Sequence, residues 1–392
     1  MMKRILWLLY ILLTLAPLAF SQNGFSAHVA VTYDHTQVPN TDQTNFPVAV
    51  VTTQTAFKTT GNGGKATSSS GFDIIPYSDV GCTSILTFEW VTQSYGASTG
   101  AIEMHVVIGT VSHTADGTFY LCVGKSSITT NQSSLTWSGY SLVDHLSDTG
   151  ASGTFNDSSS QGNSMSGIFG GMSDGAGVMG RGAVGSGTGG ISKTSPTGLP
   201  TGNGARSASV WFKFSSTSGN QALLGFGTNA STQRFMLGWS GTFLSLQNDI
   251  GGTGWGTTTC CNDTTTWHQF VWTFPASGNL NQSVLYVDGA LNSNPGSPSS
   301  SVNTVIGGLM SSQLCCGGAS SFAFTGTLDE LRITSAVLTA DWIATEYNNQ
   351  KSSSTFLTFG SVVNNGYMMP FVADVELPIW TPRILFPLLV QR

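Results

Sequence analysis

Short apolar segments separated by turn residues recur along most of the chain. Residues 86–92 (LTFEWVT), 101–108 (AIEMHVVI) and 207–214 (SASVWFKF) are examples, and a typical turn is GNGG at 61–64. Partial alternation of apolar and polar side chains over so few residues is typical of half-buried β-strands. The 48 glycines and the 9% of charged residues fit strands joined by tight turns, while 40% hydrophobic residues suffice for packed cores. The chain is therefore predicted to be all-β.

Three segments of the C-terminal half resemble one protein family. Residues 267–273 (WHQFVWT), 285–289 (LYVDG) and 326–334 (GTLDELRIT) have the order found in laminin-G-like domains, where a short helix follows, here at 340–347. The resemblance implies that residues 139–360 form a concanavalin-A-like jelly roll of two sheets. It also implies further strands, at 140–146, 207–214, 222–226, 235–239, 243–246 and 302–307.

Residues 25–138 resemble a domain of unknown function that often precedes laminin-G-like domains in bacterial surface proteins. The similarity lies in FPV at 46–48, GFDI at 71–74, MHVVI at 104–108 and YLCVGK at 120–125, although Cys122 and Val123 replace aromatic residues of the family. We therefore expect a second β-sandwich here, and a chain with two domains, as its length also suggests.

The first 21 residues read as a secretory signal peptide. A basic start (MMKR) precedes an apolar run from Ile5 to Leu15 and a small-residue region that ends at Ser21. The run is short for a membrane span, so export with cleavage is favoured over an uncleaved anchor. The protein is predicted to be secreted or held at the cell surface, with membrane contact only through export.

The charges exclude nucleic acid as a partner. The net charge is -6 and the 14 Lys and Arg residues form no basic stripe, which phosphate binding would need. The six histidines are scattered without i, i+2 or i, i+4 spacing, and no nucleophile elbow, phosphate loop or zinc-protease motif occurs.

Six cysteines predict disulfides in an exported protein. Cys82 and Cys122 are expected to bridge neighbouring strands of the first domain. The vicinal pairs Cys260-Cys261 and Cys315-Cys316 are expected to join two loops at one end of the second. Zinc binding by these four thiols is the alternative, but the usual two-residue spacer within each pair is absent.

Asp329 and Glu330 are the most obvious carboxylate pair. A retaining glycosidase needs two carboxylates about 5–5.5 Å apart on one substrate. Neighbouring strand residues point to opposite faces, so we expect these two to bond nearby backbone and Arg332 instead. The E-x-D-x-(x)-E run of laminarinase-type hydrolases does not occur in the sequence, which makes a glycoside hydrolase the third choice of function.

Calcium is the cofactor that the family resemblance suggests. Laminin-G-like relatives often bind it at the rim of the sandwich through loop oxygens. Asp144, Asp148 and Asp157 are the candidate ligands here. The alternative is that these carboxylates cap turns.

Aromatic and amide side chains predict a sugar-binding site. Trp239 and Trp255 lie near Gln247 and Asn248, and Trp255 stands within the glycine-rich segment GGTGWG at 251–256. A glycine-flanked tryptophan in a loop is a better candidate for sugar contact than Trp211, Trp267 or Trp272, which lie on apolar strands. A structural role for Trp255 is the alternative.

The expected function is recognition or adhesion outside the cell, with a glycan or a surface protein as the partner. Glycan binding through the laminin-G-like domain is favoured over a structural or assembly subunit of an extracellular appendage or matrix. Residues 361–392 form an apolar tail interrupted by Pro378, Pro382 and Pro387. These prolines oppose a helix, so we expect an extended ribbon that packs on the protein or mediates self-assembly.

Overall fold

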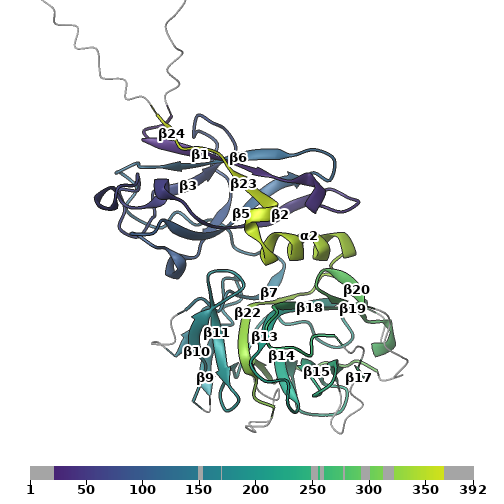
Figure 1. Cartoon of the computed structure of the whole chain (residues 1–392). Helices are drawn as coiled ribbons and strands as arrows, with labels where there is room; N and C mark the ends of the chain where they lie inside the picture. Colours follow the sequence, from purple (N-terminus) through teal and green to yellow (C-terminus); the bar gives the residue numbers. More distant parts are fainter. Residues whose placement is uncertain are drawn as a thin grey trace, which may run out of the picture.

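The computed structural model describes residues 22–148, 153–168, 170–248, 255–256, 260–276, 279–292, 301–311 and 322–365. Within these ranges the chain forms two β domains, and each has its own hydrophobic core. Figure 1 shows one domain above the other, with helix α2 (Ala340–Lys351) between them. The predicted all-β class and the two sandwiches are confirmed.

The first domain packs two sheets around one core. The larger sheet has the order β23-β1-β6-β3, with β24 also paired to β1, and the smaller has the order β2-β5-β4. Its strands are β1 (Ala27–Tyr33), β2 (Gln43–Thr53), β3 (Ile74–Tyr77), β4 (Phe88–Trp90), β5 (Ala101–Val111), β6 (Gly117–Val123), β23 (Leu357–Phe359) and β24 (Val363–Asn364). Short 3-10 helices lie at His35–Gln37, Thr55–Phe57, Thr60–Asn62 and Thr92–Ser94.

The second domain is a sandwich of two larger sheets with antiparallel strand pairs. One sheet has the order β10-β11-β22-β13-β18-β19-β20, with β7 also paired to β22. Its strands are β7 (Tyr140–Asp144), β10 (Ser173–Ala176), β11 (Arg181–Ser186), β13 (Arg206–Phe214), β18 (His268–Phe274), β19 (Val284–Val287), β20 (Ala290–Asn292) and β22 (Thr325–Thr334).

The other sheet of this domain has the order β17-β16-β15-β14-β21-β12-β9-β8. Its strands are β8 (Thr154–Phe155), β9 (Met165–Ile168), β12 (Gly190–Lys193), β14 (Gln221–Gly227), β15 (Arg234–Trp239), β16 (Leu244–Gln247), β17 (Trp255–Gly256) and β21 (Gly308–Ser311). A 3-10 helix at Leu280–Gln282 lies between β18 and β19. The strand expected at 302–307 lies later in the sequence, at β21 (Gly308–Ser311).

Strand β13 shows how the second domain is joined to helix α2. Val210 and Phe212 point into the core between the two sheets. On the opposite face, Trp211 stacks on Tyr347 of α2 at 5.4 Å between ring centroids, and its Nε1 donates to Gln350 Oε1 at 2.5 Å. Because side chains alternate along a strand, one face builds the core and the other packs on the helix.

Helix α2 also packs on the first domain. It begins after Thr339, whose side chain accepts from the Trp342 N–H. Trp342 contacts Phe46 of β2, and the Asn349 amide both donates to and accepts from the backbone of Ala49. The helix therefore belongs to the interface between the domains.

The predicted end of the second domain at residue 360 is wrong. Strand β23 pairs with β1 of the first domain, with Leu357 opposite Tyr33. Phe356 and Leu357 are buried in the core of the first domain. After the helix the chain thus returns to complete the first sheet, and the residues of β24 (Val363–Asn364) extend this pairing to Ala27.

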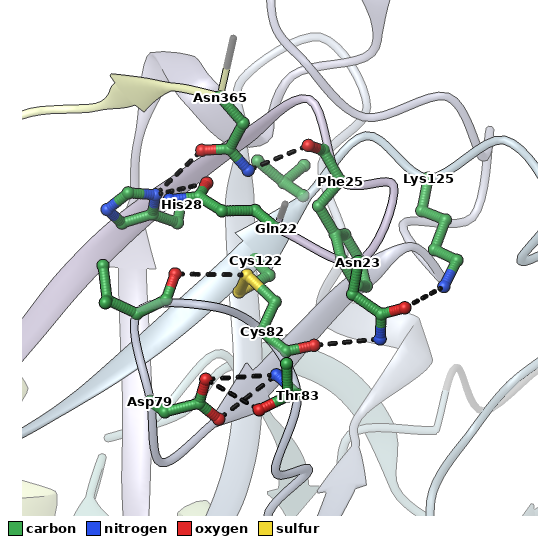
Figure 2. The surroundings of a disulfide bond; sticks show 12 residues. Gln22, Asn23, Phe25, His28, Asp79, Cys82, Thr83, Cys122, Lys125 and Asn365 are labelled. Atoms are coloured by element: carbon green, nitrogen blue, oxygen red, sulfur yellow. Dashed lines mark hydrogen bonds between the residues drawn. A yellow bond between two sulfur atoms is a disulfide. The ribbon is translucent and has the colours of Figure 1, made fainter. Parts of the chain in front are cut away.

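A disulfide joins Cys82, in the turn after β3, to Cys122 of β6, as predicted. Figure 2 shows it beside the place where both ends of the domain meet. The Asn23 amide donates to the Cys82 carbonyl at 3.0 Å, and Asp79 accepts from the backbone of the same turn. Asn365 donates to the backbone of the N-terminal segment at 2.8 Å. Covalent and polar contacts thus hold this corner together.

Cys260 and Cys261 form a disulfide with each other. Because each sulfur forms one disulfide, the predicted bridge from this pair to Cys315 and Cys316 is wrong. Cys315 and Cys316 lie outside the described residues. The proposed signal peptide, residues 1–21, and residues 366–392 of the tail also lie outside them. No helix within the described ranges is long and apolar enough to span a membrane.

Candidate functional site at the domain interface

Trp239, predicted as a sugar contact, lies in the core. It is 1% exposed, packs against Phe214 and donates through Nε1 to the Thr217 carbonyl at 2.8 Å. On β15 its side chain lies on the same face as Phe235 and Leu237, and this face points between the two sheets. This candidate is therefore wrong, because a buried tryptophan cannot stack on a ligand.

The other predicted sugar contacts lie near the β17 edge of the sheet that contains β14 to β17. Trp255 is on edge strand β17, opposite Leu246 of β16. Gln247 is half-buried and accepts from Arg234 at 3.0 Å. Asn248 is fully buried and donates to the Ser301 carbonyl at 3.0 Å, which gives it a structural role. Trp255 and Gln247 remain as the candidate contacts.

The three predicted calcium ligands bond to the protein itself. Asp157 accepts from the backbone N–H groups of Val143, Ser159 and Asn163, so both of its oxygens have partners. Asp148 accepts from the side chain of Gln93 and the backbone of Asn156. These contacts are those of loop-organising carboxylates.

Asp144, the third predicted ligand, is fully buried. Its Oδ1 accepts from the Leu146 N–H at 2.9 Å, and its Oδ2 has no hydrogen-bond partner among the described residues. Burial raises the pKa of Asp144 to about 8, with further contributions from Asp148 and Asp157. One fully buried carboxyl beside two that are bonded to the protein does not form the open oxygen set that calcium prefers, so these residues do not fit a calcium site.

The structure instead gathers charged side chains between the two domains. His145, which follows β7, bonds through Nδ1 to Glu330 Oε1 at 2.6 Å and through Nε2 to Glu89 Oε2 at 3.1 Å. Glu89 lies on β4 of the first domain, and it also accepts from Trp137 and Ser158. His145 thus links a carboxylate of each domain.

Arg332 extends this cluster from β22 to helix α2. Its guanidinium pairs with Glu330 Oε2 at 2.5 Å and with Glu346, and it lies over the Trp137 ring. The expected structural role of Asp329 and Glu330 agrees with these contacts: Glu330 bonds to Arg332, and Asp329 accepts from the Met179 N–H at 3.0 Å. Both carboxyls are at most 2% exposed.

His105 and Glu103 complete the cluster from strand β5. The His105 ring stacks on His145 at 4.6 Å between centroids and is fully buried. Glu103, two residues earlier on the same face of the strand, accepts from the Ser94 hydroxyl at 2.5 Å. His105 also lies opposite Glu89 in the pairing of β4 with β5. The fold thus brings together two histidines that are scattered in the sequence.

Sequence reasoning missed this cluster because its members come from distant segments. His145 and Glu330 are 185 residues apart, and His145 and Glu89 are 56 apart. One signal was available: in a chain with only 9% charged residues, apolar strands that carry Glu89, Glu103 or Glu330 are unusual. Such a residue needs a partner when it is buried.

A small polar cavity of about 170 Å³ lies beside the cluster. Glu89 and His145 line one side, and Gln93, Asp148 and Ser158 are among the residues that line the rest. The interface therefore joins a buried charge cluster to a cavity that is open to solvent.

The cluster sets unusual protonation states. Burial would lower the pKa of His145, but Glu330 and Glu89 together raise it well above its ordinary value. Burial would likewise raise the pKa of Glu89, but His145 lowers it to about 2. Burial lowers the pKa of His105 to about 3, with His145 adding to the effect. Without a bound metal ion, His145 is thus a cation between two anions, and His105 is neutral.

Glu103 is expected to make stability depend on pH. Burial, together with Glu330, raises its pKa from 4.5 to about 7, so the folded protein holds this proton more tightly than the unfolded chain. The stabilisation is complete below about pH 4.5 and is lost as the pH rises through 7. Glu103→Gln should therefore be more stable than the wild type at pH 8, by at most about 3 kcal/mol, and equal to it at pH 4.

Urea unfolding at several pH values, with a chelator present, measures this difference. Glu89→Gln is the matched control, because the low pKa of Glu89 predicts a loss of stability that is largest at neutral pH. A difference between Glu103→Gln and wild type that is constant from pH 4 to pH 8 would contradict the assignment.

A family model matches the second domain. Residues 185–344 match the model described as the concanavalin A-like lectin/glucanases superfamily. No curated protein sequence matches the chain.

Several solved structures match parts of the chain. Domain 4 of an extracellular GH43 arabinanase from Geobacillus stearothermophilus, in complex with arabinotriose, is 20% identical; the match covers 54% of this chain and 99% of that chain, with a TM-score of 0.40. The CBM40 of a Ruminococcus gnavus sialidase, bound to α2,6-sialyllactose, is 16% identical over 36% of this chain and 82% of that chain, with a TM-score of 0.31.

The binding domain of botulinum neurotoxin serotype D is 13% identical, with 54% of this chain and 52% of that chain covered and a TM-score of 0.39. The chain thus spans about half the length of that binding domain. At these identities and scores the similarities assign no ligand. The family match and the two-sheet sandwich together show that residues 185–344 form a concanavalin A-like domain.

Proposed function

We propose that this protein is a non-enzymatic recognition protein that binds glycan through its concanavalin A-like domain. The match of residues 185–344 to a superfamily of lectins and glucanases carries the proposal. Between those two activities, binding is favoured because Asp329 and Glu330 are buried and already bonded. Asp329 accepts from the Met179 N–H. Glu330 pairs with Arg332 and His145. A buried carboxylate that is already bonded cannot act on a glycosidic bond.

The sheet edge formed by β16 and β17 is the proposed binding region. It carries Trp255 and the half-buried amide of Gln247, an aromatic ring and a hydrogen-bonding group of the kind that sugar recognition uses. The adjacent strand β15 supports Gln247 through Arg234.

Export to the cell surface or medium is part of the proposal. The basic and apolar residues of 1–21 support it, and so does the Cys82–Cys122 bridge, because such bridges persist in oxidising compartments.

Glycan-array binding followed by calorimetry tests the function. Trp255→Ala is expected to weaken glycan binding about tenfold or more, which corresponds to the loss of one aromatic stacking contact. Trp267→Ala is the matched control, because Trp267 is half-buried beside Lys213 on the opposite sheet. It should bind as the wild type does.

Absence of any glycan binding by the full chain would overturn the proposal. If such a chain also assembles into large species in analytical ultracentrifugation, the assembly subunit becomes the better function. Equal losses in the two tryptophan variants would move the binding region away from the β16–β17 edge.

A further inference from the structure

His105, His145 and Glu330 place three metal-binding atoms close together. One ligand atom from each lies within 4.8 Å of the others, and all three residues are buried. His145 Nδ1 is 2.6 Å from Glu330 Oε1, and His105 Nε2 is 3.9 Å from the same oxygen. Two imidazoles and one carboxylate are a ligand set that zinc and related divalent ions use.

The His105 ring supplies an independent observation. Its residue is 0% exposed, and neither ring nitrogen has a hydrogen-bond partner among the described residues. A buried polar atom without a partner is costly, and few native proteins retain one without a reason. A metal ion between His105 and Glu330 would give one of these nitrogens a bond.

The surrounding contacts match those of a metal centre. A histidine that binds a metal usually donates its other ring N–H to a carboxylate, and His145 Nε2 faces Glu89 Oε2 at 3.1 Å. A ligating carboxylate is usually held by further bonds, and Arg332 holds the second oxygen of Glu330 at 2.5 Å. Glu89 and Arg332 therefore hold His145 and Glu330 in fixed orientations.

Carboxyl groups are numerous around the three residues. Arg332 supplies the guanidinium of the cluster. Five carboxyl groups lie around Arg332 and the two histidines: Glu89, Glu103, Asp329, Glu330 and Glu346. Glu103 Oε1 has no hydrogen-bond partner in the described part of the chain. The cavity lined by Glu89 and His145 reaches the cluster at His145.

We propose that His105, His145 and Glu330 bind a divalent first-row transition metal, with zinc as the best fit, and that this ion joins the two domains. His105 comes from strand β5 of the first domain, whereas Glu330 comes from strand β22 of the second. One ion thus bonds to both domains and fixes their relative position. The site is independent of the proposed glycan region and does not involve the cysteines.

Metal analysis of the full chain, expressed without a polyhistidine tag, tests the proposal. After treatment with a chelator and dialysis against zinc, the wild type should contain one zinc per chain by plasma mass spectrometry. Its melting temperature should rise by about 3 °C or more relative to the chelator-treated protein. Cobalt(II) in place of zinc should give visible absorption bands of a nitrogen and oxygen site.

Two variants locate the ion. His105→Gln should abolish the bound zinc and the thermal shift. His35→Gln is the matched control, since His35 belongs to the partly exposed group of Asp34, His35 and Asp116. It should retain both.

The wild-type measurements remain decisive if His105→Gln does not fold. No zinc in the wild type would overturn the proposal, and would leave His145 as a salt-bridged cation without a metal. Loss of zinc in His35→Gln, or its retention in a folded His105→Gln, would overturn it as well.

Discussion

Methionine in place of Arg332 is expected to lower the free energy of unfolding by about 3–5 kcal/mol. The guanidinium is buried between Glu330 and Glu346 and lies over the Trp137 ring. Its removal leaves Glu346 without a cation and Glu330 with His145 as its one remaining cation. The cost of an unpaired buried charge is far larger than that of a broken surface pair.

Arg181→Met is the matched control for this measurement. Arg181 pairs with Asp174 in the same domain, but both side chains are about one-third exposed. Its replacement should lower stability by at most about 1 kcal/mol. Urea unfolding followed by tryptophan fluorescence gives both values, and equal losses in the two variants would show that Arg332 has no special role in the interface.

A chain that ends after Ser352 is expected to lose at least about 5 kcal/mol of stability in its first domain. The deletion removes Phe356 and Leu357, which are buried in the core of that domain, and it leaves β1 without its partners β23 and β24. An exposed strand edge is also a site for pairing with other chains, so aggregation should increase.

The matched control is a chain that ends after Asn365, which keeps both strands and the contacts of Asn365 with Phe25 and His28. Thermal unfolding and limited proteolysis should find its first domain intact. If the two truncated chains are equally stable, the pairing of residues 357–364 with β1 contributes nothing to the domain.

The strands of the two sandwiches could be predicted from local patterns. GTLDELRIT, WHQFVWT and LYVDG fall within or across β22, β18 and β19, where β-branched and aromatic residues occur between turns. The pairing of β23 with β1 could not be predicted, because LTF at 357–359 is too short to indicate a partner. His28 and Asn365, which meet at this edge, are 337 residues apart.

The candidate site was predicted less well than the fold. Trp239 was assigned to a ligand from its neighbours in sequence, but the pleat of β15 turns it inward. Asp148 was assigned to calcium from its place in the sequence, but it lines the interface cavity and accepts from the Gln93 side chain and the Asn156 N–H. The charge cluster itself depends on two domains and a helix meeting, and no single segment carries that information.

The return of the chain to β1 has a consequence for the order of folding. The first domain has most of its strands by Val123, but its sheet is complete only when β24 (Val363–Asn364) is available. The concanavalin A-like domain must therefore fold as an insertion within an unfinished neighbour, since every one of its strands lies between these two points. During synthesis the edge of β1 stays unpaired while the second domain folds. Contacts between such distant segments form slowly. Residues 357–364, which are synthesised after the second domain, thus complete the sheet of the first.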